Sequence, residues 1–377
     1  MGTYFSKKLF YNSKKIMKIF FDATVFEQPF TGVAKSTLEL YKACFDIDSN
    51  IQFTALYKNN LYEKLPHKIK SVQIAKYVPN KIWRHLVISS KLKSEKNSII
   101  HFPWNGNIPK LPSDITVITT FHDVLPLIIP EYFKSNKEKV QYCKKVQKDI
   151  NRTDLLITDS EFSKKQIIKN FKLKKDPIVI YLGPSIKLKK HLENKYNSYF
   201  LYVGGYDKRK GIEELINIFL KLKQEKEIES RLILTGAKKY YSAELKKLIY
   251  KGIKNNSISE LGYVEDNLLA NLFLNAKALI YPSKYEGFGL PILDAMSLGC
   301  PVVTTRETSI PEVGGDAPLY IDSDNKNEFT NAVINIEKDI NLREKLKAKG
   351  LKQSKKFSWQ KSAANFLKNL QKVVKEI

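Results

Sequence analysis

The sequence predicts an α/β protein of two doubly wound, Rossmann-like domains that face a central cleft, each with a mostly parallel sheet covered by helices. Two observations predict it. Short apolar runs alternate with helical stretches along the whole chain, and polar or glycine-rich loops follow several of these runs. With 377 residues and 43% hydrophobic residues, the chain is long enough for two separate hydrophobic cores.

The first half contains seven short apolar runs that are typical of buried strands. Helical stretches separate them, among them 133–150 and a helix for which Ser160 and Ser163 supply N-cap chemistry. The predicted strands are 17–22, 51–57, 71–78, 99–102, 115–121, 155–158 and 178–182.

The second half repeats this scheme, with a helix predicted over 212–224 and an amphipathic final helix that begins after Ser358. Its predicted strands are 200–205, 231–235, 260–263, 278–281 and 301–305. The resulting domain plan is an extension at 1–16, a first domain at 17–183, a linker at 184–198, a second domain at 199–356 and a C-terminal helix at 357–377.

The net charge of +25 comes mostly from lysine, which accounts for 58 of the 64 basic residues. Such lysine excess is typical of proteins from AT-rich genomes, and attraction to an anionic membrane face is the functional alternative. Scarce arginine disfavours a nucleic-acid partner. No apolar run reaches the length of a membrane span, and three well-separated cysteines indicate a reducing compartment. We therefore expect a cytoplasmic protein that can lie on the inner membrane face.

The stretch 281–299 carries the clearest functional signal. A glycine-rich loop, Gly287-Phe288-Gly289, joins a buried strand to a helix that starts near Pro291 and ends at Gly299. Free backbone N–H groups at such a helix N-terminus favour a bound anion. This arrangement predicts a phosphate site.

Two carboxylates flank this predicted site, Glu286 in the loop and Asp294 in the first turn of the helix. A carboxylate beside a phosphate is electrostatically unfavourable unless it has another task, such as accepting hydrogen bonds from sugar hydroxyls. The structural alternatives are an exposed loop acid and a helix first-turn acid that the helix dipole favours. A phosphate beside a polyol predicts a sugar nucleotide.

A second cationic loop supports this interpretation. Arg209 and Lys210 follow the glycine pair Gly204-Gly205 at the end of a predicted strand, where they could bind a diphosphate and stabilise it as a leaving group. A solvated charge run is the alternative in so lysine-rich a chain.

Two residues of the first half occupy similar positions at strand ends. His122 directly follows the strand 115–121, where it would either orient a substrate or serve as a structural hydrogen-bonding residue. Gly32 lies in a loop between a strand and a helix and would let a ligand approach the backbone.

From Met17 onward the chain resembles the retaining glycosyltransferases of family 4, which have the GT-B fold. Their motif has a Glu, seven residues and a second Glu around Gly-Phe-Gly-Leu-Pro, and it matches Glu286 to Asp294 with Asp in the second position. The segments 115–130, 158–164, 203–211, 304–317 and 357–359 are similar to other family motifs in the same order.

The resemblance implies a donor site for a nucleotide diphosphate sugar. Arg209 and Lys210 would hold the diphosphate, Glu286 the transferred sugar and Asp294 the ribose, although its side chain is one methylene shorter than Glu. His122 would contact the sugar near the reaction centre. The remaining donor contacts would come from Gly32, Gly204, Gly205, Gly287, Phe288, Gly289 and Leu290.

The expected function is therefore metal-independent transfer of a sugar, with mannose from GDP-mannose favoured, to a glycan or lipid-linked acceptor in surface polysaccharide synthesis. The configuration at the anomeric carbon would be retained, the C-terminal helix would cross back to the first domain, and no cofactor is expected beyond the donor substrate. A GT-B-like sugar-nucleotide epimerase or phosphorylase is the alternative, and a nucleic-acid binder is a further one. A dehydrogenase is disfavoured because no Gly-x-Gly-x-x-Gly follows a strand.

Overall fold

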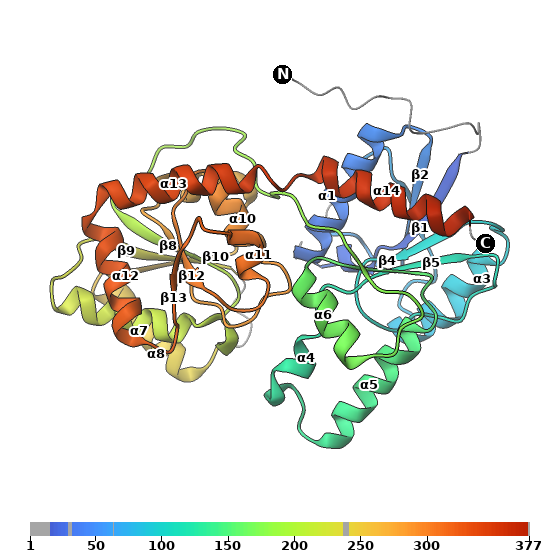
Figure 1. Cartoon of the computed structure of the whole chain (residues 1–377), viewed down its shortest axis with the longest axis horizontal. Coiled ribbons are helices and arrows are strands. Elements are labelled where there is room, and N and C mark those ends of the chain that lie inside the picture. The colour runs from blue at the N-terminus through green and yellow to red at the C-terminus, as the bar shows by residue number, and fades with distance from the viewer. Residues whose placement is uncertain (1–15, 29–31, 63, 237–240, 376–377) are drawn as a thin grey trace. The chain divides into compact units, whose positions relative to one another are not determined.

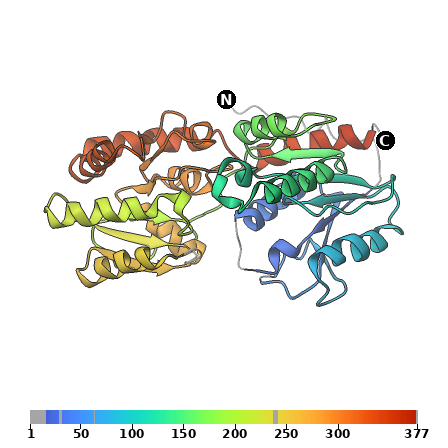
Figure 2. The same ribbon diagram turned by 90° about the horizontal axis from the view of Figure 1, so that it is seen from below.

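A computed structural model describes residues 16–28, 32–62, 64–236 and 241–375 of the chain. The predicted extension at 1–16 lies, apart from Ile16, outside the described residues. The described chain forms a seven-stranded and a six-stranded sheet, with helices beside the strands of both (Figures 1 and 2). Strands β1 to β13 pair in parallel with their described neighbours, which confirms the predicted α/β class of two doubly wound sheets.

The chain divides into two compact units, and each unit is built from segments that are separated in the sequence. The first unit comprises the described residues up to Thr120, Lys145–Leu156 and Ala363 onward, and the second comprises Phe121–Lys144 and Ile157–Ser362. Segments 121–144 and 157–183 thus group with the second unit, and the last helix, α14 (Trp359–Lys375), has residues in both. The predicted boundaries, the cleft and the crossing of the last helix stay predictions.

The first sheet has the strand order β3-β2-β1-β4-β5-β6-β7, so the direction of winding reverses between β1 and β4. Its strands are β1 (Met17–Asp22), β2 (Ile51–Tyr57), β3 (Lys70–Gln73), β4 (Ile99–Phe102), β5 (Thr116–Thr120), β6 (Leu155–Thr158) and β7 (Ile178–Val179). The helical segments of this part are η2 (Thr24–Phe26), α1 (Gly32–Ile47), α2 (Asn80–Ile82), η3 (Trp83–Ile88), α3 (Ser89–Leu92), α4 (Leu125–Ile128), η4 (Pro130–Tyr132), α5 (Asn136–Ile150) and α6 (Glu161–Asn170).

The second sheet has the order β10-β9-β8-β11-β12-β13 and reverses between β8 and β11. Its strands are β8 (Tyr199–Val203), β9 (Arg231–Thr235), β10 (Ile258–Gly262), β11 (Leu279–Tyr281), β12 (Val302–Thr305) and β13 (Leu319–Ile321). The helical segments are η5 (Lys208–Lys210), α7 (Ile212–Gln224), α8 (Ala243–Lys254), α9 (Asp266–Asn275), α10 (Leu290–Ser297), α11 (Ile310–Gly314), α12 (Lys326–Lys338) and α13 (Ile340–Ser354).

Each sheet is covered by apolar side chains that alternate with the strand period of two. In the first unit, Phe20, Ile100 and Phe102 pack with Trp83 and Ile88 of η3 on one face. On α1, Tyr41 makes ring contacts with the β1 residue Phe21, the β2 residue Phe53 and the β4 residue His101. This packing fixes the carboxyl ends of β1 and β4 beside each other.

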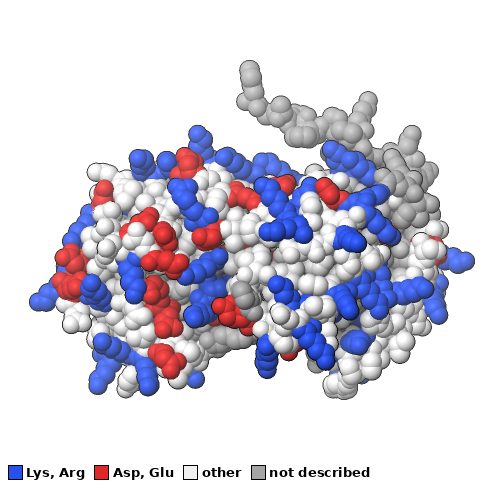
Figure 3. All heavy atoms as spheres, turned by 60° about the horizontal axis from the view of Figure 1, so that its bottom comes forward, with Lys and Arg blue, Asp and Glu red and all other residues white. Residues whose placement is uncertain are grey.

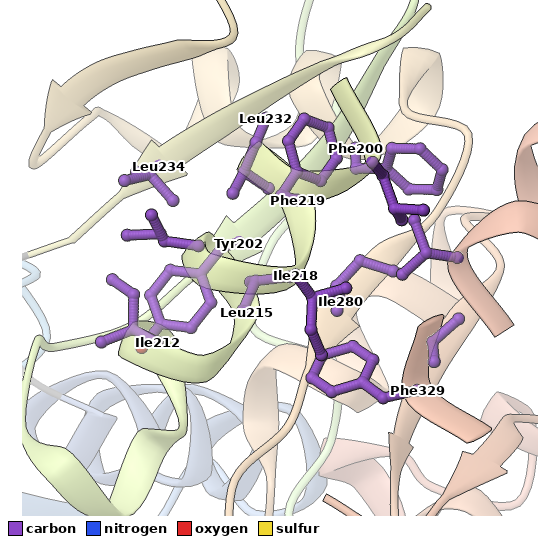
Figure 4. Close-up of a cluster of buried hydrophobic side chains, with 14 of the residues drawn as sticks. Phe200, Tyr202, Ile212, Leu215, Ile218, Phe219, Leu232, Leu234, Ile280 and Phe329 are labelled. Atoms are coloured by element: carbon purple, nitrogen blue, oxygen red, sulfur yellow. The ribbon is translucent and has the colours of Figure 1, made fainter. Parts of the chain in front are cut away.

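In the second unit, helix α7 packs its apolar stripe on β8 and β9 (Figure 4). Phe219 is fully buried and makes an edge-to-face contact with Phe200, with ring centroids 5.8 Å apart. Leu215 and Ile218 of the same helix belong to this cluster together with Leu232 of β9 and Ile280 of β11. Because α7 follows the loop 208–211 directly, this core holds that loop at the end of β8.

Most predicted elements are confirmed, several to the residue. The strands 51–57, 99–102, 155–158 and 231–235 and the helix 212–224 have the predicted bounds. The predicted strand 71–78 is wrong beyond Gln73, because the exposed segment 75–77 contains two residues with positive φ. The three-residue strand β13 was not predicted, since its apolar run is too short to stand out.

Basic side chains spread over the whole face drawn in Figure 3, whereas the acidic ones lie mostly on its left part. On that face they do not gather into one basic patch, which agrees with the compositional explanation of the lysine excess. Within the described part of the chain, no helix combines the length and the apolarity that spanning a bilayer requires.

The Phe219 packing leads to a stability prediction. We expect Phe219→Ala to lower the free energy of unfolding by about 3–5 kcal/mol, because it removes a fully buried ring and leaves a cavity. The control Tyr250→Ala, at a 68% exposed position on α8, should change it by no more than about 0.5 kcal/mol. Urea unfolding followed by circular dichroism measures both, and equal losses would contradict this account of the core.

Candidate functional site

The centre of the site is the buried carboxylate of Glu286, in the loop between β11 and α10. Its Oε1 atom accepts hydrogen bonds from Lys210 Nζ at 2.5 Å, Ser283 Oγ at 2.5 Å and Tyr281 Oη at 2.8 Å. The Tyr281 hydroxyl in turn accepts a hydrogen bond from Lys210 Nζ at 2.7 Å. Three donors on one oxygen keep this carboxylate fixed and ionised.

Charge and burial act against each other in this pair. Burial raises the pKa of Glu286, but the Lys210 and Arg209 cations outweigh burial and hold that pKa below its ordinary value. Burial also lowers the pKa of Lys210, while Glu286 raises it, and the net direction is downward. The four hydrogen-bonded groups therefore form one coupled unit of opposite charges rather than a solvated charge run.

A tight turn brings Lys210 to Glu286. Gly211 has φ +66°, and a Cβ there would lie 2.4 Å from the carbonyl oxygen of Pro282. Only glycine fits both this backbone conformation and this close approach. This turn joins η5 to α7. It therefore packs the loop 208–211 against the residues that follow β11 and precede Glu286.

Arg209 lies beside this unit. Its Nη1 donates to the carbonyl oxygen of Tyr285 at 2.7 Å and is 3.8 Å from Glu286 Oε1, while its Nε lies 2.9 Å from Asp207 Oδ1 without hydrogen-bond geometry. Burial alone would lower the pKa of Arg209, but Glu286 and Asp207 raise it. The guanidinium is thus a permanent cation at the predicted diphosphate position.

The backbone of the glycine loop packs closely against His122. A Cβ at Gly287 would lie 2.7 Å from the His122 carbonyl oxygen, so a larger residue cannot be placed there without moving one of the two segments. Ser163 Oγ donates to the carbonyl oxygen of His122 at 3.0 Å, and Ser160 Oγ donates to that of Gly287 at 2.7 Å. Within the second unit, the structure therefore brings His122 and the loop 286–289 together.

The imidazole of His122 has a carboxylate partner that the sequence analysis missed. His122 Nδ1 lies 2.5 Å from Asp159 Oδ2, and Asp159 is buried. Such a carboxylate fixes the ring orientation and the tautomer. Asp159 follows β6 just as His122 follows the neighbouring strand β5, so the shared sheet edge was the signal that could have found it.

The segment from β11 to α10 has the predicted order of a strand, a glycine loop and a helix. Gly289, with φ +103°, is the N-cap of α10, Pro291 lies at its start and Gly299, with φ +73°, follows its end. Phe288 is buried against the rings of Tyr181 and Phe357, which anchors the loop. Leu290 is the first helical residue.

Asp294 differs from its predicted position and has partners that were not foreseen. It lies one turn after the start of α10, which begins at Leu290, so its placement in the first turn was wrong. Its Oδ1 accepts from the N–H groups of Ser185 and Ile186 at 2.6 and 3.1 Å, and its Oδ2 accepts from Ser185 Oγ at 2.9 Å. The carboxylate therefore holds the segment after β7, and its contact with a ribose stays a prediction.

The remaining predicted ligands are glycines. Gly204 and Gly205 follow β8, where Gly204 N–H donates to Thr235 and the Gly205 carbonyl accepts from Tyr202 Oη. Gly32 begins α1 in the first unit, and the residues just before it, 29–31, lie outside the described chain. Over the described ranges, no group of three or more His, Cys, Asp or Glu side chains could hold a metal ion.

Comparison with known proteins identifies the relatives of this chain. The family model for glycosyl transferases group 1 matches residues 185–353, which include both loops of the site. The chain is 31% identical over 373 residues to the O-antigen chain mannosyltransferase B of Escherichia coli, covering 91% of this chain and 97% of that protein. It is 27% identical over 218 residues to the O-antigen chain mannosyltransferase RfbU of Salmonella typhimurium, covering 58% of this chain and 60% of that protein.

Solved structures show the same fold at low sequence identity. Sucrose-phosphate synthase from Thermosynechococcus elongatus matches with a TM-score of 0.76 at 15% identity, covering 96% of this chain and all of that one. HepE from Anabaena, solved with UDP and glucose, matches with a TM-score of 0.72 at 17% identity, covering 94% of this chain and all of that one. The fold is GT-B, and the chain belongs to the group 1 glycosyl transferases.

Proposed function

We propose that this protein transfers a sugar from a nucleotide diphosphate donor to a glycan or lipid-linked acceptor, with retention of anomeric configuration and without a metal ion. The observation that carries the proposal is the buried unit of Lys210, Glu286 and Tyr281 beside the cation of Arg209. This unit combines fixed positive charge for a diphosphate with a fixed carboxylate for sugar hydroxyls. Glu286 lies four residues before the start of α10, where the positive end of the helix dipole favours an anion.

The chemical step follows from these charges. The bond between the anomeric carbon and the diphosphate oxygen breaks, and the acceptor hydroxyl oxygen bonds to that carbon on the same face. The acceptor proton passes to the departing diphosphate oxygen. Arg209 and Lys210 stabilise the negative charge that develops on the leaving group, which is the role that a metal ion has in other transferases.

Glu286 would position the transferred sugar. Its Oε1 is occupied by three donors, whereas no hydrogen bond is given to Oε2 by the described residues. Oε2 is therefore the oxygen that would accept hydrogen bonds from sugar hydroxyls. His122, held by Asp159, would contact the same sugar from the loop that packs against Gly287.

The donor sugar is proposed from the relatives. The two O-antigen relatives are named as mannosyltransferases, so mannose is the first candidate and O-antigen-like surface polysaccharide the expected product. Synthesis of such a product would favour a location in the cytoplasm at the inner membrane face, where the net charge of +25 would favour contact with anionic lipid.

A donor panel tests the reaction. We expect one UDP- or GDP-sugar, with GDP-mannose first, to raise the melting temperature and to be hydrolysed slowly without acceptor. Transfer to an acceptor should persist in excess EDTA, and NMR of the product should show the donor's anomeric configuration. Inversion or loss of activity in EDTA would contradict the proposed mechanism, and release of an epimerised free sugar would instead indicate an epimerase.

The role of Glu286 makes a second prediction. We expect Glu286→Gln to lower kcat roughly 100- to 1,000-fold, because it removes the charge that faces the sugar and pairs with Lys210. The control Glu344→Gln, at an exposed position on α13, should keep full activity. Steady-state kinetics on variants with native circular dichroism spectra measure this effect. Undiminished turnover of Glu286→Gln would exclude a role of Glu286 in positioning the sugar.

Tyr281 should act as a positioning residue through the pKa of Glu286. Its hydroxyl donates to the ionised carboxylate, so Tyr281→Phe removes a stabilising hydrogen bond and raises the pKa of Glu286. In the wild type, that pKa lies below its ordinary value, so activity that needs ionised Glu286 is lost only as the pH falls below the usual range of a glutamate. The variant's acid limb should therefore shift to higher pH, as measured by kcat/KM between pH 4 and 8, and an unshifted limb would refute this coupling.

A further inference from the structure

A second polar cluster lies in the first unit, at the carboxyl ends of β1 and β4. The winding of the first sheet reverses between these two strands. In open α/β sheets, ligands bind outside the carboxyl ends of the strands at such a reversal. Asp22 ends β1, and Trp104 follows β4 by two residues.

A fully buried arginine connects the two strand ends. Arg84 Nε donates to Asp22 Oδ2 at 2.5 Å, and Arg84 Nη2 donates to Thr24 Oγ1 at 2.9 Å. The guanidinium lies over the ring of Trp104, with its central carbon 4.6 Å from the ring centroid. Arg84 belongs to η3, a π-helical turn, and such turns are frequent at functional sites.

The loop that carries Trp104 is also held from the side of α5. Asp149 is buried and accepts hydrogen bonds from the N–H groups of Asn107 and Ile108, both at 2.9 Å. Arg152 Nη1 donates to the carbonyl oxygen of Ile108 at 2.6 Å. With the arginine on its ring and the loop anchored behind it, the half-buried indole is fixed in place.

Two N–H groups of this cluster have no partner. Arg84 Nη1 and Trp104 Nε1 are both buried without a hydrogen bond in the described structure. An unsatisfied buried donor is destabilising, and an incoming hydroxyl oxygen would supply the missing acceptor. The unsatisfied donors therefore point to a ligand that brings oxygen acceptors.

The charge balance decides the class of ligand. Asp22 neutralises Arg84 at direct contact, so the cluster does not present a free cation for a phosphate or a carboxylate. A rigid indole offers an apolar surface, and the two N–H groups offer hydrogen bonds. A neutral sugar ring, with one face of C–H groups and hydroxyls at its rim, matches both features.

We propose that Trp104, positioned by Arg84, binds a neutral sugar ring of the acceptor glycan. This inference rests on the proposed transferase function and gives its acceptor a site within the first unit. It adds a specificity-determining residue that is separate from the donor residues of the second unit. The Asp22–Arg84 pair fixes the indole, and Arg84 Nη1 is available to donate to a hydroxyl of the same sugar.

Acceptor kinetics test the proposal with methyl α-D-mannopyranoside and an α-linked mannose disaccharide methyl glycoside. We expect Trp104→Ala to raise the acceptor KM roughly tenfold or more while the donor KM stays unchanged. Trp104→Phe, which keeps an aromatic face, should recover part of the loss. The control Tyr77→Ala removes an aromatic that is 80% exposed elsewhere in the first unit and should change neither constant.

Fluorescence provides a readout that does not depend on transfer. The chain has three tryptophans, Trp83, Trp104 and Trp359, so the methyl glycosides should change the wild-type emission and leave that of Trp104→Phe unchanged. Trp359→Phe should keep the response. If the donor panel fails but this response is present, the sugar site stands without the proposed function. An unchanged acceptor KM in folded Trp104→Ala, or an equal response in Trp104→Phe, overturns the proposal.

Discussion

The buried ion pair between Lys210 and Glu286 is the interaction on which the candidate site depends. Removing two charges from water costs several kcal/mol per ion, and their attraction offsets this cost only when further hydrogen bonds satisfy them. Tyr281 and Ser283 supply those bonds on Glu286 Oε1. The close turn at Gly211 is needed to bring the lysine there, so the loop after β8 and the loop after β11 cannot move independently.

The same loop is constrained on its other side by the contact between Gly287 and His122. The hydroxyls of Ser160 and Ser163 tie the two carbonyl groups together, and Glu312 accepts hydrogen bonds from the first two N–H groups of α6. Glycine at position 287 is thus a packing requirement. The ion pair between Lys210 and Glu286 on one side and the contact with His122 on the other hold the loop in a single arrangement.

Sequence patterns predicted these positions because parallel strands bring their carboxyl ends to one edge. His122, Lys210 and Glu286 each follow a predicted strand, and apolar periodicity was enough to place them. Their partners Asp159 and Tyr281 were missed, because the choice of a hydrogen-bond partner depends on side-chain directions that no local pattern encodes. The same reason hid the anchoring of Trp104 by Arg84, which lies twenty residues earlier in the sequence.

Asp294 has a side chain one methylene shorter than the Glu of the family motif, and its carboxylate has a structural role. Its short carboxylate accepts three hydrogen bonds from Ser185 and Ile186, so most of its acceptor capacity is used to hold the segment after β7. A longer Glu side chain would have to bend back to make the same bonds. If Asp294 also binds a ribose, the direction of its Oδ2 is set by the Ser185 hydroxyl. The segment at 185–186 would then help to orient the donor site, because a shift of its backbone would also turn the Asp294 carboxylate to which it donates hydrogen bonds.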